Sequence, residues 1–196
     1  MLINEKKYLT GTREINPAFT LHKIGEYASF KVQNTDVGKQ LEIVTALLMC
    51  GLTLEALLND IGYSMFVLKA NEIELWNAVE RLSPKKKLDA IAERLNLKID
   101  YGCKPFQYFS KIFKYRDYLV HGKYKKIEKH RVEIKEIEIS YLEDIECFKD
   151  EWEKETIEEN IDKWRKTVSD IADILTEKAE LNNILHLADF QSWSLF

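Results

Sequence analysis

The stretch LEIVTALLMCGLTLEALLNDI, residues 41–61, decides the fold class of this chain. Its apolar residues cover almost the whole circumference of a helix with 3.6 residues per turn, which leaves no broad face for water. Other helices must cover a helix of this kind, so we expect it in the middle of a helical bundle. Its uncharged part, residues 43–54, is about two-thirds of the roughly 18 residues that a membrane span needs. We therefore predict a buried core helix and no membrane association.

Shorter helical patterns surround this central segment. Asp36 is a good N-cap for the central helix, and Gly62 could end it. Ser83-Pro84 is a start signal for another helix, whose first-turn lysines, Lys85 to Lys87, we expect to be exposed. The helices predicted from these signals are 18–32, 37–61, 73–82, 84–95 and 105–122.

The chain after residue 122 shows a different pattern. Apolar and polar residues alternate over 132–141 with one slip, which predicts a strand with a bulge. A lone strand is not stable, so it would pair with residues 123–130 or with the N-terminal residues. Beyond residue 143 we expect a long helix or a broken pair of helices, whose apolar seam packs on the bundle or on a second chain. The seam consists of Ile157, Ile161, Trp164, Val168, Ile171 and Leu175.

The predicted fold class is therefore mainly α. We expect one helical domain over residues 1–196, with a small β element at about 123–141 and a C-terminal helical extension at about 143–196. The composition, 45% hydrophobic and 32% charged, is that of an ordinary folded protein. The three cysteines are far apart and none has a partner at metal-ligand spacing, so we expect neither disulfides, metal nor cofactor, and a cytoplasmic location.

The net charge of −4 gives no overall reason to expect nucleic acid, but the charges are unevenly distributed. Residues 111–131 contain eight Lys or Arg against two acids, and residues 143–159 contain nine acids against two lysines. One interpretation is two solvated faces. The other is an anion-binding surface on the basic block, with the acidic stretch facing elsewhere.

The helix that ends at Gly122 places a permanent cation on its apolar face. A projection at 100° per residue puts Arg116 near the middle of a face made by phenylalanine, isoleucine, leucine and valine. Burial of an unpaired guanidinium costs several kcal/mol, so a carboxylate, helix-end carbonyls or an anionic ligand must neutralise it. His121 precedes Gly122, which we expect to end the helix in the left-handed conformation. An imidazole at that position is competent for proton transfer near neutral pH.

The sequence KIFKYRDYLVHG, residues 111–122, thus contains an arginine, a polar residue, a short spacer, a histidine and a glycine at a helix end. This Arg-x4-His arrangement resembles the signature of the HEPN superfamily, with Asp117 in the polar position. The upstream run LSPKKKLDAIAERL at 82–95, followed by a loop and an aromatic-rich helix, is similar as well. The resemblance covers roughly residues 37–122.

The resemblance implies an α-helical bundle that forms a homodimer and brings two Arg-x4-His motifs to one cleft. Many members are metal-independent endoribonucleases, in which a ribose 2′-hydroxyl attacks the adjacent phosphate. Carried over to this chain, His121 would transfer the proton, Arg116 would stabilise charge on the phosphoryl oxygens, and Asp117 would orient one of them. We expect a toxin or anti-phage effector that acts on RNA, with an antitoxin protein as a candidate partner.

Helix geometry adds a reason for the dimer. Arg116 and His121, five residues apart, point about 140° away from each other, so two chains would serve one phosphate better than one. Further contacts to RNA are expected from basic and aromatic residues near the helix end. These residues are Lys114, Tyr118, Lys123, Tyr124, Lys125 and Lys126, with Tyr115 as another stacking residue.

Two alternatives remain open. In the first, the chain is a non-catalytic HEPN-like module that binds RNA or nucleotide, or that dimerises. In the second, the motif is purely structural: Arg116 forms an ion pair inside the bundle, and His121 bonds a carbonyl near the helix end.

Overall fold

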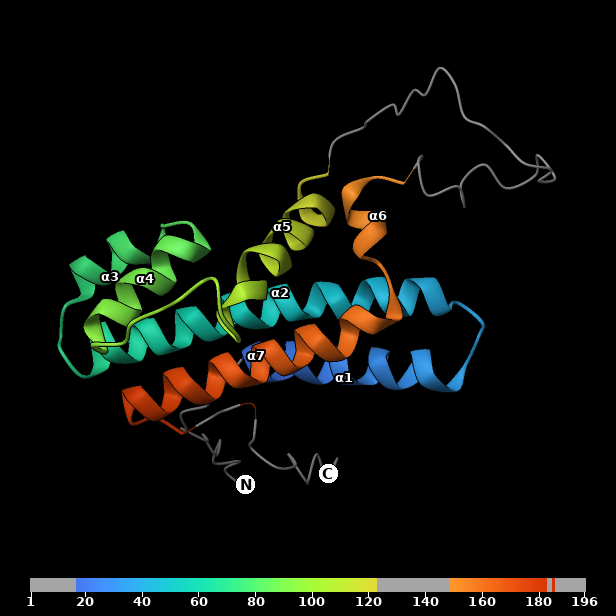
Figure 1. Ribbon diagram of the computed structural model, residues 1–196. Helices are drawn as coiled ribbons and strands as arrows, with labels where there is room; N and C mark the ends of the chain where they lie inside the picture. Colours follow the sequence, from blue (N-terminus) through green and yellow to red (C-terminus); the bar gives the residue numbers. More distant parts are fainter. Residues whose placement is uncertain (1–16, 123–148, 183–184, 186–196) are drawn as a thin grey trace, which may run out of the picture.

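The computed structural model describes residues 17–122, 149–182 and 185, all of whose regular elements are helical (Figure 1). In chain order they are α1 (Pro17–Asn34), α2 (Lys39–Tyr63), the π-helical turn η1 (Ser64–Leu68), α3 (Ile73–Glu80), α4 (Pro84–Arg94), the 3-10 turn η2 (Phe106–Tyr108), α5 (Phe109–Val120), α6 (Glu151–Glu155) and α7 (Glu158–Ala179). The mainly α fold class is confirmed. The predicted strand at 132–141 and its partner 123–130 lie outside the described residues.

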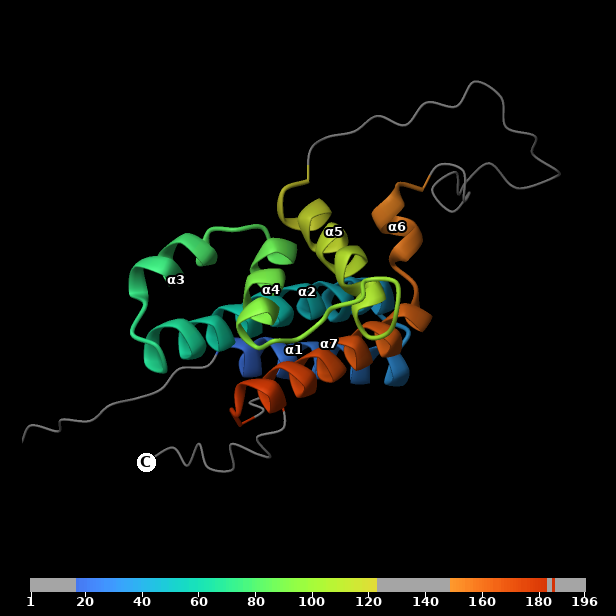
Figure 2. The ribbon, with the colours of Figure 1, turned by 60° about the vertical axis from the view of Figure 1, so that its left-hand side comes forward.

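Helix α2 is the centre of the bundle, as its sequence predicts. It contacts α1, α4, α5 and α7, and Figures 1 and 2 show α1 and α7 running along one side of it while α5 crosses the other. Leu47, Leu54, Leu57 and Leu58 on α2 are completely buried. Burial of such a side chain stabilises the fold by about 1.5–3 kcal/mol, so α2 holds a large share of the core free energy.

Both ends of α2 differ from the prediction. Gly38, not Asp36, is the N-cap residue; its φ of 73° lies in the left-handed region, which suits glycine. Asp36 contributes only its backbone carbonyl to the turn, as the acceptor for Lys39 N–H. Gly62 does not end the helix, which continues through η1 to Leu68. A Cβ at Gly62 would lie 2.1 Å from Cζ3 of Trp76, so this glycine permits close packing rather than a stop.

The continuous helix Lys39–Leu68 is long and apolar enough, by length and composition alone, to cross a membrane. Its best 18-residue window has a mean hydropathy of 1.9, and half of that window is buried inside the bundle. The core helix of a soluble protein meets the same criterion. The absence of membrane association stays a prediction.

The C-terminal extension is a broken pair of helices, one of the two predicted forms. Asp150 and Glu153 form a reciprocal capping box that starts α6, and α7 follows after a short break. Of the predicted seam, all but Ile157 are buried, and α7 packs along α2. The seam therefore belongs to the core of this chain.

The position of α5 depends on a glycine in α2. A Cβ at Gly51 would lie 2.8 Å from the Cβ of Arg116, so the two helices approach closely at this residue. The approach fixes α5, which contains the Arg-x4-His motif, against the central helix.

We predict that Gly51→Ala destabilises the fold by about 1 kcal/mol, measured by urea unfolding. Alanine in a helix gains about 1 kcal/mol over glycine, but overpacking costs about 1–3 kcal/mol. Two other buried helical glycines calibrate the effect. A Cβ added at Gly62 would lie 2.1 Å from Trp76, and a Cβ added at Gly25 would lie 3.0 Å from Met49. We expect the largest destabilisation for Gly62→Ala, a smaller one for Gly51→Ala and the smallest for Gly25→Ala. A stabilised Gly51→Ala protein would contradict the close approach.

Candidate active site

Helix α5 ends at Val120 with His121 as its C-cap residue, close to the predicted end at Gly122, but not through a left-handed glycine. The backbone N–H of His121 donates to the carbonyl of Asp117 at 3.0 Å, which completes the last turn. The backbone of Gly122 does not adopt a positive φ. A Cβ at Gly122 would lie 2.6 Å from the carbonyl oxygen of Tyr118. Glycine is needed there because the chain passes close to the preceding turn.

Arg116 is buried, with 10% of its side chain exposed, and carboxylates of the same chain neutralise it. Its Nη1 lies 3.4 Å from a carboxylate oxygen of Glu55 on α2, and its Nε lies 3.2 Å from Oδ1 of Asp117. The guanidinium also lies over the ring of Phe113, 5.3 Å from the centroid. The expectation that something must neutralise this cation is confirmed, and within the bundle Glu55 and Asp117 do so.

A second buried cation faces the same carboxylate. The predicted exposure is confirmed for Lys85 and Lys86 but is wrong for Lys87, which is only 4% exposed. Its ammonium donates to Oδ1 of Asn59, one turn after Glu55 on α2, at 2.5 Å. Burial lowers the pKa of Lys87; Glu55 and Glu80 oppose the shift, and Arg116 adds to it. Glu55, Asn59, Lys87 and Arg116 thus form a polar cluster that joins α2, α4 and α5.

A cavity of about 790 Å³ opens on the other side of α5. Of the predicted site residues, Asp117, His121, Lys114 and Tyr118 line it, and Arg116 does not. Asp117 and His121 are one turn apart and share a face of α5, whereas Arg116 points inward to α2. One chain therefore brings the carboxylate and the imidazole to a common cavity and leaves the guanidinium behind Asp117.

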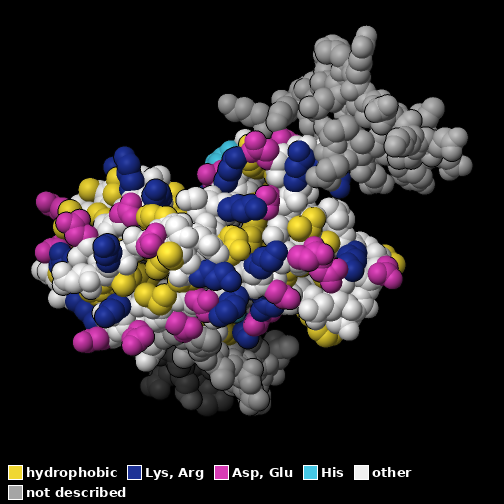
Figure 3. All heavy atoms as spheres, in the orientation of Figure 1, with side chains coloured by type: hydrophobic (Ala, Val, Ile, Leu, Met, Phe, Trp, Pro, Cys, Tyr) yellow, Lys and Arg dark blue, Asp and Glu magenta, His cyan; other side chains and the backbone are white. Residues whose placement is uncertain are grey.

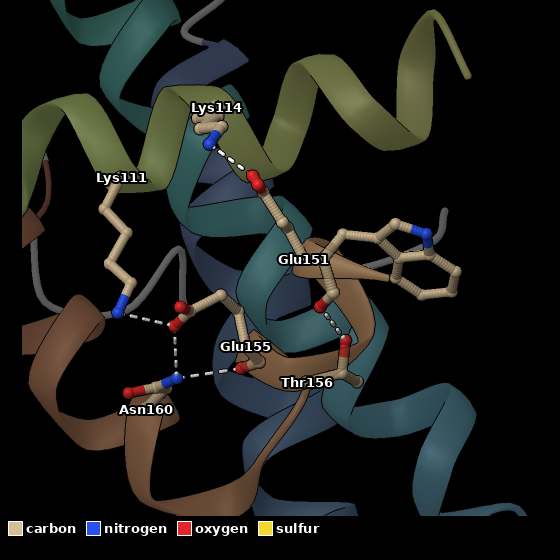
Figure 4. Close-up of polar contacts among 7 residues, drawn as sticks. Lys111, Lys114, Glu151, Glu155, Thr156 and Asn160 are labelled. Carbon is tan, nitrogen blue, oxygen red and sulfur yellow. Dashed lines mark hydrogen bonds and ion pairs between the residues drawn. The ribbon is translucent and has the colours of Figure 1, made fainter. Parts of the chain in front are cut away.

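Two further segments line the cavity: residues 83–85 at the start of α4, and Asp150 and Trp152 at the start of α6. Ion pairs hold α6 against α5 (Figure 4). Lys111 Nζ lies 2.7 Å from Glu155, and Lys114 binds Glu151. The hydroxyl of Tyr118 donates to the same Glu151 carboxylate at 3.2 Å. The hydrogen bond from Lys114 to Glu151 raises the pKa of this lysine.

These pairs contradict one of the two interpretations of the charge distribution, in which the acidic stretch faces away from the basic block. In the described part of the two stretches, Lys111, Lys114 and Arg116 all contact carboxylates. Basic and acidic side chains are likewise interspersed on the face seen in Figure 3. The other predicted RNA-binding residues, Lys123, Tyr124, Lys125 and Lys126, lie outside the described ranges 17–122 and 149–182.

Tyr115 cannot stack on a base, contrary to the prediction. It is 1% exposed, its hydroxyl lies 3.0 Å from that of Thr156, and its ring meets Trp164 edge to face at a centroid distance of 5.2 Å. Burial raises the pKa of its hydroxyl. Tyr115 therefore packs α5 onto α7.

The sequence analysis missed two sets of residues. Phe109, Phe113 and Trp152 line the cavity, although their spacing suggested only core packing. The cluster residues Glu55 and Asn59 stand one turn apart on a helix that is otherwise almost wholly apolar. That pair of polar residues was the available signal for the cluster, because a buried polar group needs a partner.

Comparisons with protein families, with curated proteins and with solved structures found no match for this chain. Among the described residues, no group of three or more His, Cys, Asp or Glu side chains is placed to hold a metal ion.

We predict that the pair of Arg116 and Glu55 couples more strongly than the exposed pair of Lys114 and Glu151. Double-mutant cycles with Arg116→Met and Glu55→Gln, and with Lys114→Met and Glu151→Gln, measure both couplings by chemical unfolding. Glu55 is about one-third exposed, so we expect roughly 1–2 kcal/mol for the first pair, and a clearly smaller coupling for the second, whose side chains are exposed. Equal couplings would show that burial adds nothing at Arg116.

We also predict that Lys87 makes stability rise with pH. Its pKa is lowered in the folded state, so the unfolded chain binds more protons between that lowered value and about 10.4. Over this window the free energy of unfolding of the wild type should increase relative to Lys87→Met. Lys86→Met, at an exposed neighbour, controls for the loss of one positive charge. A difference between wild type and Lys87→Met that falls with pH would contradict the lowered pKa.

Proposed function

We propose that this chain is an HEPN-like protein that cleaves RNA without a metal ion, at the cavity beside the end of α5. The observation that carries the proposal is that Asp117 and His121 line one cavity, while Arg116 lies directly behind Asp117 at 3.2 Å. An imidazole that shares a cavity with a carboxylate, itself next to a buried cation, is an arrangement suited to proton transfer.

In the proposed reaction the ribose 2′-oxygen attacks the neighbouring phosphorus, and the bond from phosphorus to the 5′-oxygen breaks. The products are a 2′,3′-cyclic phosphate and a 5′-hydroxyl. His121 takes the proton of the 2′-hydroxyl or supplies one to the leaving 5′-oxygen, and Asp117 orients the imidazole. A homodimer would place the His121 of a second copy at the same cleft, so that one imidazole acts as base and the other as acid.

The contacts of Arg116 give it a different role from the one expected of it. Its guanidinium lies beside the carboxylates of Glu55 and Asp117, although its Nε makes no hydrogen bond among the described residues. We therefore assign it an electrostatic role, in which it positions Asp117 within one chain. Charge on the phosphoryl oxygens would then be stabilised by His121 in its protonated form. The biological class we propose is a cytoplasmic toxin or anti-phage effector, with an antitoxin protein as its partner.

The second candidate is a non-catalytic HEPN-like module that binds RNA or nucleotide. One observation favours it: both cations of the motif helix nearest the cavity, Lys114 and Arg116, already have carboxylate partners. With these cations neutralised, the site offers little stabilisation of the charge that builds up on the phosphoryl oxygens in the transition state. Such a site would bind its ligand without cleaving it.

We predict that the purified protein cleaves single-stranded RNA of mixed sequence in excess EDTA. His121→Ala should reduce the rate at least 100-fold, because a positioned acid or base contributes about 10²–10⁴-fold. Asp117→Asn should reduce it about tenfold or more. The products, separated by gel electrophoresis and mass spectrometry, should be cyclic phosphates and 5′-hydroxyls, and a fully 2′-deoxy strand should stay intact.

His22→Ala is the matched control, since His22 lies on α1 and outside this cavity, and its activity should equal that of the wild type. Cleavage that persists in His121→Ala, or that EDTA abolishes, would refute the proposed reaction. Salt-dependent RNA binding with no cleavage would establish the second candidate instead.

A further inference from the structure

The cavity beside His121 has an aromatic interior that proton transfer does not require. Phe109 and Phe113 line it with ring centroids 4.7 Å apart, Trp152 lines it from α6, and Tyr118 lines it near the end of α5. Its volume, about 790 Å³, lies within the usual range of about 300–1,000 Å³ for small-molecule sites.

Two of the charged side chains that line this interior are in ion pairs, and a third lies over an aromatic ring. Lys114 binds Glu151, Asp117 lies at 3.2 Å from Arg116, and Lys85 stands over the ring of Tyr101 at 4.4 Å. A phosphate inside the cavity would have to separate such pairs and lose its own hydration. A flat, neutral, aromatic ring would not, and its polar edge could bond to the hydroxyls of Ser83 and Ser110, which line the same cavity.

We propose that the cavity binds an unpaired nucleobase of the RNA, with the adjoining phosphate outside it beside His121. The base stacks on the aromatic side chains, chiefly Trp152, which is only partly buried. A base can enter only if it is not held in a duplex, so the substrate class is single-stranded RNA. This inference rests on the proposed function for the placement of the phosphate, but base binding itself does not require cleavage.

The test is a binding measurement with a strand that cannot be cleaved. The probe is a fluorescein-labelled 2′-O-methyl octa-adenylate, titrated with the full chain and followed by fluorescence anisotropy. The same strand in a duplex with its complement, and an abasic ribose-phosphate strand of equal length, should each bind at least about tenfold more weakly. A stacked base contributes enough affinity for a loss of that size.

Three variants locate the base. Trp152→Ala should weaken binding about tenfold, and Trp152→Phe, which keeps an aromatic ring, should restore it to within about threefold of the wild type. Ser110→Trp fills the cavity from an exposed position of α5 and should abolish binding even if Trp152→Ala fails to fold. Phe30→Ala, which removes a ring exposed by 58% on α1, should change nothing.

Equal affinity for the single strand, the duplex and the abasic strand would overturn the base pocket, and so would unchanged binding by Ser110→Trp. Neither result bears on cleavage, because the probe lacks the attacking hydroxyl. Conversely, normal base binding by a protein that cleaves nothing would refute the reaction proposed above and leave the base pocket standing.

Discussion

The close contact between α2 and α5 is the constraint on which the candidate site depends. Gly51 lets the stem of Arg116 approach α2, and its guanidinium then reaches Glu55. Burial of that cation is tolerable only beside a carboxylate, so the contact fixes the rotation of α5 about its own axis. With Arg116 turned inward, helix geometry turns Asp117 and His121 outward, about 40° apart, toward one cavity. The orientation of Asp117 and His121 is thus a consequence of the ion pair that Arg116 forms with Glu55 on the inward face of the same helix.

The polar cluster behind the site contains two cations beside one carboxylate, which is a costly arrangement. Lys87 and Arg116 both lie near Glu55, and burial lowers the pKa of the lysine. An apolar core at this point would be at least as stable, since buried ion pairs seldom add net free energy. What the cluster adds is geometry. Asn59 holds α4 through Lys87, and Glu55 holds α5 through Arg116. Two polar residues one turn apart on α2 therefore set the positions of α4, which begins near the cavity, and of α5, which ends there.

The sequence was sufficient for those parts of the fold that depend on apolar periodicity. The central position of α2, the helices on both sides of it and the seam of α7 all follow from which residues must avoid water. The helix ends were less predictable. Gly38 acts through its own left-handed backbone conformation, and Gly62 acts through close packing against Trp76, which follows later in the chain. Asp117 and His121 could be placed on one helix face, and the need for a partner to Arg116 could be foreseen. Neither Glu55 as that partner nor the pairing of Lys111 and Lys114 with α6 could be, because each joins segments more than 30 residues apart.

The pairing of charges around the cavity bears on how any RNA would be recognised there. Attraction to the phosphate backbone depends on protein cations that replace the counterions of the nucleic acid. This attraction carries no sequence information. In the described part of the motif helix the cations already have carboxylate partners, so this term is small at the cavity itself. Aromatic stacking does not suffer from such neutralisation, and it acts only on bases that are out of a duplex. At the proposed RNA site, affinity would therefore come from unpaired bases more than from backbone charge.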